Sequence, residues 1–133
     1  MTFAVDTSAL VAVLRAEDDA PQIVQALGRS PRHLISAGSY LEACLVTTRK
    51  GSEAVRLKAL LDTAAIDVVP VSPDDAEIAA DAFLRYGRGS GHPAQLNFGD
   101  CFAYALAKAR NLPLLFKGDD FIHTDIEPAL RPA

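Results

Sequence analysis

The chain has 133 residues, of which 50% are hydrophobic and 23% are charged, and its formal net charge is -4. This length and apolar content predict one compact domain, residues 1–133, with little room for a second. No apolar run approaches the ~20 residues that span a bilayer. The two cysteines, Cys44 and Cys101, form no CxxC pair, which argues against zinc. An acidic chain is not typical of a dedicated duplex-binding protein.

Short apolar strands alternate with amphipathic helices along the chain. The predicted strands are residues 3–6, 33–36, 66–71 and 113–116, with a further short strand at 124–126. The predicted helices are residues 8–15, 20–27, 39–50, 53–64, 73–86 and 99–110, and residues 87–97 form a Gly-containing loop. This alternation predicts an α/β sandwich with a mostly parallel central sheet of four or five strands.

Acidic residues stand where these apolar elements end or where helices begin. Asp6 ends the first strand, and Asp119 and Asp120 follow the strand at 113–116. Glu42 lies in the first turns of the third helix, and Asp100 opens the last one. Ligands of parallel sheets bind beyond the carboxyl ends of the strands, so we expect Asp6 and Asp119 to open onto the same edge of the sheet.

The same acids also have ordinary structural interpretations. Asp6 suits an N-cap, Glu42 stands at capping-box distance from Ser39, and Asp100 suits a first-turn acid that the helix dipole favours. The acids that follow Gly118 suit a turn. Taken singly, each interpretation is at least as good as a functional one.

Taken together, the four acids point to a metal ion. Carboxylates that are gathered in an apolar setting repel each other unless a cation compensates their charge. They supply only hard oxygen ligands, which favours Mg²⁺ or Mn²⁺ over zinc or copper. Such ions act on phosphate esters. From Gly87 to Gly118 the only acid is Asp100 while four residues are basic, which suits a phosphate-bearing substrate or a solvated charged surface.

Four motifs resemble those of PIN-domain ribonucleases of the VapC toxin type, in the order and at the spacing of that family. They are VDTSAL at 5–10, SYLE at 39–42, NFGDCFAYALA at 97–107, and LLFKGDDF with TDI at 114–121 and 124–126. The resemblance covers essentially the whole chain. It implies a PIN-like three-layer α/β/α sandwich and a cytoplasmic enzyme.

The resemblance also implies the chemistry. Asp6, Glu42, Asp100 and Asp119 would form the catalytic acidic set, in register with the family, while Asp120 stays open as the alternative fourth member. Asp6 and Asp100 would bind Mg²⁺, for which Mn²⁺ can substitute, and Ser8 or Thr7 would hydrogen-bond around them. The enzyme would hydrolyse RNA phosphodiester bonds without a covalent intermediate. A VapB-type antitoxin would neutralise it, a homodimer is expected, and no membrane is involved.

The family pattern differs at Lys117, where Thr or Ser is common. Lys117 would contact substrate phosphate, tether a neighbouring carboxylate or be solvated. Arg85, Arg88 and His92 are candidates for an RNA path.

Other functions fit the residues less well. A phosphatase of the haloacid-dehalogenase type needs a second Asp two residues after the first, where this chain has Ser8. A receiver-like signalling domain needs an Asp at the end of a middle strand, where this chain has Val71 and Ser72. The remaining alternative is a PIN-like domain that binds RNA without cleaving it.

Overall fold

Four strands form one parallel sheet in the structure, a computed structural model that describes residues 1–130. The strand order is β3-β2-β1-β4, with β1 at Ala4–Val5, β2 at His33–Ser36, β3 at Ile66–Val69 and β4 at Leu114–Leu115. The predicted parallel sheet is confirmed with four strands. Within residues 1–130, the segment at 124–126 adds no fifth strand; nearby, Pro128 makes an isolated bridge to Leu114.

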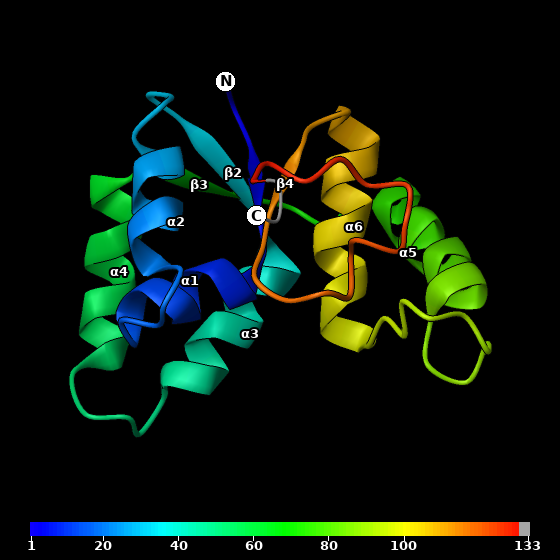
Figure 1. The fold of residues 1–133 in the computed structure, drawn as a ribbon, viewed down its shortest axis with the longest axis horizontal. Coiled ribbons are helices and arrows are strands. Elements are labelled where there is room, and N and C mark those ends of the chain that lie inside the picture. The colour runs from blue at the N-terminus through cyan, green and yellow to red at the C-terminus, as the bar shows by residue number, and fades with distance from the viewer. Residues whose placement is uncertain (131–133) are drawn as a thin grey trace.

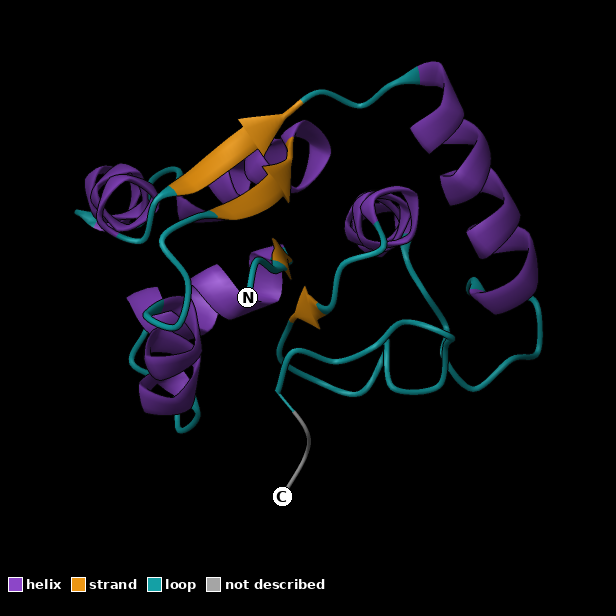
Figure 2. Cartoon of the chain, turned by 90° about the horizontal axis from the view of Figure 1, so that it is seen from above, coloured by secondary structure: helices purple, strands orange, loops and turns teal. Residues whose placement is uncertain are grey.

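Six helices cover the two faces of this sheet (Figure 1). They are α1 (Thr7–Leu14), α2 (Ala20–Leu27), α3 (Ala37–Thr47), α4 (Glu53–Thr63), α5 (Pro73–Tyr86) and α6 (Phe98–Arg110). Figure 2, seen from above, shows the strands between one group of helices and the pair formed by α5 and α6. Helix α3 packs with α1 and α4 and also contacts α6. The expected three-layer sandwich is therefore confirmed.

Alternating strand residues build a separate core on each face of the sheet. Val5, Ile35 and Leu115 pack with the helices α1 to α4. Their neighbours Ala4, Leu34 and Leu114 pack with α5 and α6. Because successive side chains of a strand point to opposite faces, short strands that are apolar throughout can be buried on both sides. Polar residues directly follow such strands, and Asp6 is the residue that follows β1.

Helix α3 begins earlier than its sequence predicts. The Ser36 hydroxyl accepts a hydrogen bond from the Gly38 N–H at 3.2 Å, so the last residue of β2 is also the N-cap of α3. The predicted start at Ser39 and the capping box of Ser39 with Glu42 are therefore wrong. Glu42 lies in the second turn, where it closes no helix end, and the helix ends at Thr47.

Several other polar side chains have structural roles in the fold. Ser72 caps α5 in a capping box with Asp75. Cys44 and Cys101 are free thiols. His33 is buried, accepts from the Phe3 N–H and pairs with the Leu27 carbonyl, as a structural histidine would. In the part of the chain that the structure describes, no helix is both long and apolar enough to cross a membrane.

Candidate active site

Asp6 is a buried carboxylate at the carboxyl end of β1. Its side chain caps α1, since Oδ2 accepts a hydrogen bond from the Ser8 N–H at 3.0 Å. Only 4% of the residue is exposed, and Oδ1 is buried without a hydrogen-bond partner. Burial raises the pKa of Asp6 to about 6; contacts with Ser8 oppose this rise and the charge of Glu42 adds to it. Asp6 therefore caps α1 with one carboxylate oxygen and keeps the other oxygen available at the candidate site.

Asp100 faces Asp6 from the first turn of α6. Its Oδ2 accepts from the Asn97 N–H at 3.0 Å, and the Asn97 side chain accepts from the Asp100 N–H at 2.9 Å, which makes a capping box. The pKa of Asp100 is raised to about 7, chiefly by burial; the backbone hydrogen bond from Asn97 opposes this rise, and the charges of Asp6 and Asp120 add to it. Two carboxylates from different layers thus meet at one point and resist ionisation together.

Glu42 reaches the same place from α3 and lies against Gly99 of α6. A Cβ on Gly99 would stand 2.2 Å from Glu42 Oε2, so only glycine lets this carboxylate lie over the start of α6. The charge of Glu42 raises the pKa of Asp6, which shows that the two groups are neighbours. The sequence did not single out Gly99, because its role depends on contact between two helices far apart in the chain.

A Gly99→Ala change is expected to displace the Glu42 carboxylate and leave the fold intact. The atoms that the new methyl group would meet are the far end of a flexible side chain, which can move at low cost. We expect the free energy of unfolding to change by less than about 1.5 kcal/mol and the affinity for a divalent cation to fall roughly tenfold. A loss of more than about 1.5 kcal/mol in the free energy of unfolding, measured by denaturation, would contradict this prediction. Unchanged cation affinity, measured by Mn²⁺ titration, would contradict it as well.

The structure distinguishes the two adjacent acids that follow β4, Asp119 and Asp120, by their contacts with Asp100. The Asp120 side chain raises the pKa of Asp100 through its charge and a hydrogen bond. Asp119 is exposed, and its backbone carbonyl accepts from the Ile122 N–H at 3.2 Å in a turn. Gly118, with φ of +103°, sets the direction of this turn. The structure thus pairs Asp6 with Glu42, and Asp100 with Asp6 and Asp120, and among residues 1–130 it records no corresponding contact for Asp119.

These groups fit the protein side of a site for a divalent cation. The unpartnered oxygen of Asp6 and the mutual repulsion of the carboxylates are both relieved when a cation binds. Within residues 1–130, no three ligand side chains are already gathered tightly enough to enclose an ion. An open arrangement of this kind suits Mg²⁺, which is usually held by one or two carboxylates, several waters and substrate phosphates.

Hydrogen bonds around the acids tie the end of β4 to α1, and α1 to α3. The Ser8 hydroxyl accepts from the Lys117 backbone N–H at 2.9 Å, and the Thr7 hydroxyl donates to the Ser39 carbonyl at 2.8 Å. The Lys117 side chain pairs with Glu17 at 2.7 Å and with Asp19 at 3.3 Å. Of the predicted roles for Lys117, the tether to neighbouring carboxylates is the one that the structure shows.

The proposed RNA path is only partly available for binding. Arg85 is engaged with Asp81 and Tyr104, and the Nδ1 atom of His92 accepts from the Ala94 N–H. Arg88 is exposed in the 87–97 loop. Arg88 therefore stays a candidate for RNA contact, while Arg85 has a structural role.

Comparison with known proteins agrees with this geometry. The PIN domain family model matches residues 3–127. The chain is 49% identical over 127 residues to the VapC ribonuclease Mb2780c of Mycobacterium bovis, covering 94% of this chain and 97% of that protein. It is 47% identical over 128 residues to ribonuclease VapC28 of Mycobacterium tuberculosis, covering 95% and 96%. The chain belongs to the VapC group of the PIN-domain family.

Solved structures show the same fold at low sequence identity. The sarcin-ricin-loop-cleaving toxin VapC20 of Mycobacterium tuberculosis aligns with a TM-score of 0.77 at 19% identity, covering 98% of this chain and 99% of that one. A toxin–antitoxin complex from Klebsiella pneumoniae aligns with a TM-score of 0.73 at 20% identity, covering 98% and 99%. The predicted family and fold are therefore both confirmed for this PIN domain.

Proposed function

We propose that this VapC-type PIN domain is a metal-dependent endoribonuclease toxin that hydrolyses RNA phosphodiester bonds in the cytoplasm. The observation that carries the proposal is the buried Asp6 carboxylate, which has one oxygen without a hydrogen-bond partner and a charge that acts on Asp100. The relatives that are almost half identical over nearly the whole chain are named VapC ribonucleases, which supports RNA as the substrate.

Asp6 and Asp100 would hold the ion, Mg²⁺ or Mn²⁺, between the end of β1 and the start of α6. When bound, the ion supplies charge stabilisation of a phosphoryl oxygen and activation of water. Glu42 and Asp120 stand beside this pair, where their carboxylates can orient water and accept its proton. We assign the fourth acidic position to Asp120 in place of Asp119, because Asp120 is the residue whose side chain meets Asp100.

Protein partners are part of the proposal. An antitoxin of the VapB type would neutralise the enzyme, and the enzyme itself would form a homodimer. Among solved structures of this fold is VapBC2 from Rickettsia felis, described as bound to a DNA fragment from their promoter. Large apolar side chains on this chain are more than half exposed, namely Leu41, Leu45, Leu84 and Phe98, and a protein partner would cover such side chains.

The test is cleavage of total cellular RNA by the purified protein with Mg²⁺, with Mn²⁺ and with EDTA. We expect discrete fragments that require the metal and are absent when Asp100→Asn protein, purified in parallel, replaces the wild type. RNA that binds but stays intact would favour the non-cleaving alternative. Hydrolysis of p-nitrophenyl phosphate in place of RNA would favour a phosphatase. Equal cleavage by both preparations would indicate a contaminating nuclease and remove the support for the proposal.

A further inference from the structure

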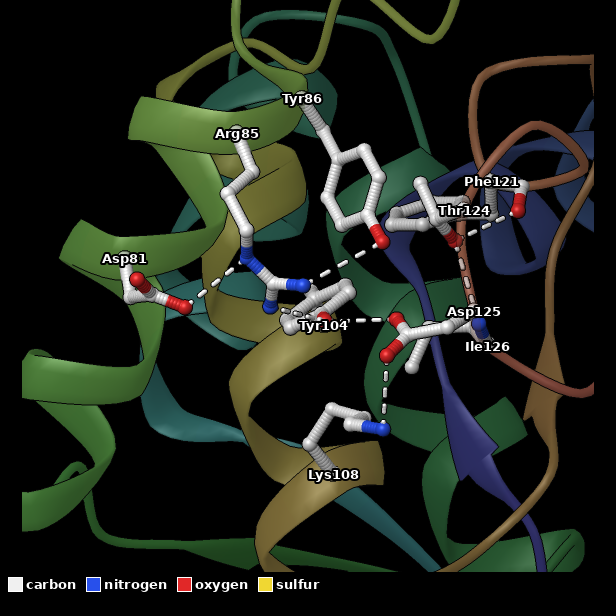
Figure 3. Close-up of polar contacts among 9 residues, drawn as sticks. All are labelled: Asp81, Arg85, Tyr86, Tyr104, Lys108, Phe121, Thr124, Asp125 and Ile126. Carbon is white, nitrogen blue, oxygen red and sulfur yellow. Dashed lines mark hydrogen bonds and ion pairs between the residues drawn. The ribbon is translucent and has the colours of Figure 1, made fainter.

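The segment that carries Asp120 has no helix or strand of its own to hold it. Between β4 and residue 130 the described chain runs through turns and bends, and Asp120 itself is exposed. Its position opposite Asp100 therefore depends on anchors before and after it. The Lys117 N–H bond to Ser8 is the anchor before it. The anchor after it is Asp125 (Figure 3).

Asp125 is clamped by two side chains of α6. The Tyr104 hydroxyl donates to Asp125 Oδ1 at 2.6 Å, and Lys108 Nζ lies 2.9 Å from Oδ2. Although partial burial opposes it, the hydrogen bonds from Tyr104 and Lys108 lower the pKa of Asp125. Tyr104 is fully buried, and burial raises the pKa of its hydroxyl, so it acts as a donor. The Asp125 carboxylate is thus held as an ionised acceptor and the Tyr104 hydroxyl as a protonated donor.

The clamp sits in register with the active site. Asp100, Tyr104 and Lys108 are spaced by four residues and share one face of α6. The tail follows this face, because Asp120 meets Asp100 while Asp125 meets the other two side chains. Each four-residue step along a helix covers about 6 Å. A fixed contact at Tyr104 therefore sets how far along α6 the Asp120 carboxylate lies.

The chain between Asp120 and Asp125 is short and folded into a turn, so the position of Asp125 determines the position of Asp120. Phe121 is 2% exposed and packs on Phe116 with ring centroids 5.1 Å apart. The Thr124 hydroxyl donates to the Phe121 carbonyl at 2.7 Å and accepts from the Ile126 N–H at 3.2 Å. Figure 3 shows this turn directly beside the clamp. Movement of Asp125 would therefore move the turn that begins at Asp120.

A second layer orients the Tyr104 hydroxyl. Arg85 of α5 donates to this oxygen at 3.1 Å and is itself held by Asp81 at 2.9 Å. The oxygen thus accepts from Arg85 and donates to Asp125, which leaves one orientation for its proton. The nearby Tyr86 hydroxyl accepts from Arg85 at 3.4 Å and makes no other hydrogen bond within residues 1–130.

We propose that Tyr104 and Asp125 are positioning residues of the active site, whose hydrogen bond fixes the Asp120 carboxylate against Asp100. Neither residue touches the substrate or the ion in this proposal. The inference rests on the proposed function in that Asp120 is taken as part of the metal-binding set. Its distinctive consequence is that loss of one hydroxyl, one helical turn away from the site, weakens ion binding.

The experiment compares Tyr104→Phe and Asp125→Ala with two matched controls. Tyr86→Phe removes the neighbouring hydroxyl, and Asp125→Asn keeps an acceptor for Tyr104. Amide hydrogen exchange of residues 119–126 in the metal-free protein reports the anchor, and Mn²⁺ titration reports the site. We expect Tyr104→Phe and Asp125→Ala to speed exchange in this segment and to weaken Mn²⁺ binding roughly tenfold. Both controls should stay near wild type, with exchange in α6 unchanged in all variants.

Unchanged exchange, or faster exchange with unchanged Mn²⁺ affinity, would overturn the proposal. If Tyr104→Phe does not fold, Asp125→Ala decides the same question from the partly exposed side of the contact. A wild-type protein that neither binds Mn²⁺ nor cleaves RNA would refute the proposed function instead. The exchange measurement needs no metal and would still show whether Tyr104 and Asp125 hold the segment.

Discussion

Asp6→Asn and Asp100→Asn are each expected to abolish RNA cleavage and, at the same time, to stabilise the metal-free protein. Asp6 is buried, and its pKa of about 6 lies well above the ordinary value of 3.8, so its charge destabilises the fold at neutral pH. The shift of about two pKa units corresponds to roughly 3 kcal/mol, as an upper value. Asp6→Asn removes the charge, and the new amide oxygen can still cap α1.

Cleavage should fall at least about a hundredfold in either variant, since the ion loses a charged ligand. The melting temperature of the metal-free protein at pH 8 should rise by several degrees, on the order of 5 °C. Asp74→Asn is the matched control, because Asp74 is an exposed first-turn acid of α5, remote in sequence from both carboxylates. A drop in melting temperature for both Asp6→Asn and Asp100→Asn would show that these carboxylates are structural groups.

The stability of the metal-free protein is expected to fall as the pH rises from 5 to 8. The folded-state pKa values of Asp6 and Asp100, about 6 and about 7, lie above the unfolded value of 3.8. The folded protein therefore binds more protons than the unfolded chain in this range, and stability decreases with pH until both groups are ionised. Between pH 5 and 8 Asp6 alone contributes roughly 1.4 kcal/mol to this loss, since only about one pH unit of the interval between its two pKa values lies above pH 5. Asp100 acts in the same direction.

Urea denaturation at half-unit pH steps measures this dependence. Groups with lowered pKa values, such as Glu53 beside Arg15 and Asp125 beside Tyr104, lose their contribution only as the pH falls toward their own low pKa values. The range from pH 5 to 8 thus reports Asp6 and Asp100. The double Asn variant should show a flat profile there, and added Mg²⁺ should stabilise the wild type more at pH 8 than at pH 5. A wild-type profile as flat as that of the double variant would contradict the prediction.

The position of Asp6 at the carboxyl edge of the sheet could be predicted because it follows from topology, whereas the family resemblance implied the place of Asp100 in the same acidic set. Asp6 ends β1, which pairs in parallel with both β2 and β4. Acids that follow parallel strands come to one edge of the sheet. The apolar pattern also predicted the order of strands and helices, since each strand is buried on both faces by helices of the expected kind.

Local turn geometry decided the features that the sequence did not predict. Ser36 and Ser39 are both good caps, and the direct passage from β2 into α3 selects Ser36. Asp119 and Asp120 are adjacent acids, and only the turn after Gly118 decides which one meets Asp100. Pairing of Tyr104 with Asp125 joins positions 21 residues apart and has no periodic signal.

Mn²⁺ binding by wild type, Asp6→Asn, Asp100→Asn, Asp119→Asn and Asp120→Asn, measured by calorimetry at pH 7.5, tests the metal centre most directly. Asp119→Asn and Asp120→Asn, which change adjacent acids, serve as matched controls for each other. We expect the wild type to bind Mn²⁺ and both Asp6→Asn and Asp100→Asn to lose binding. Binding should be clearly weaker in Asp120→Asn and near normal in Asp119→Asn. Equal Mn²⁺ affinity in the wild type and in Asp6→Asn and Asp100→Asn would contradict the assignment of the ion to these carboxylates.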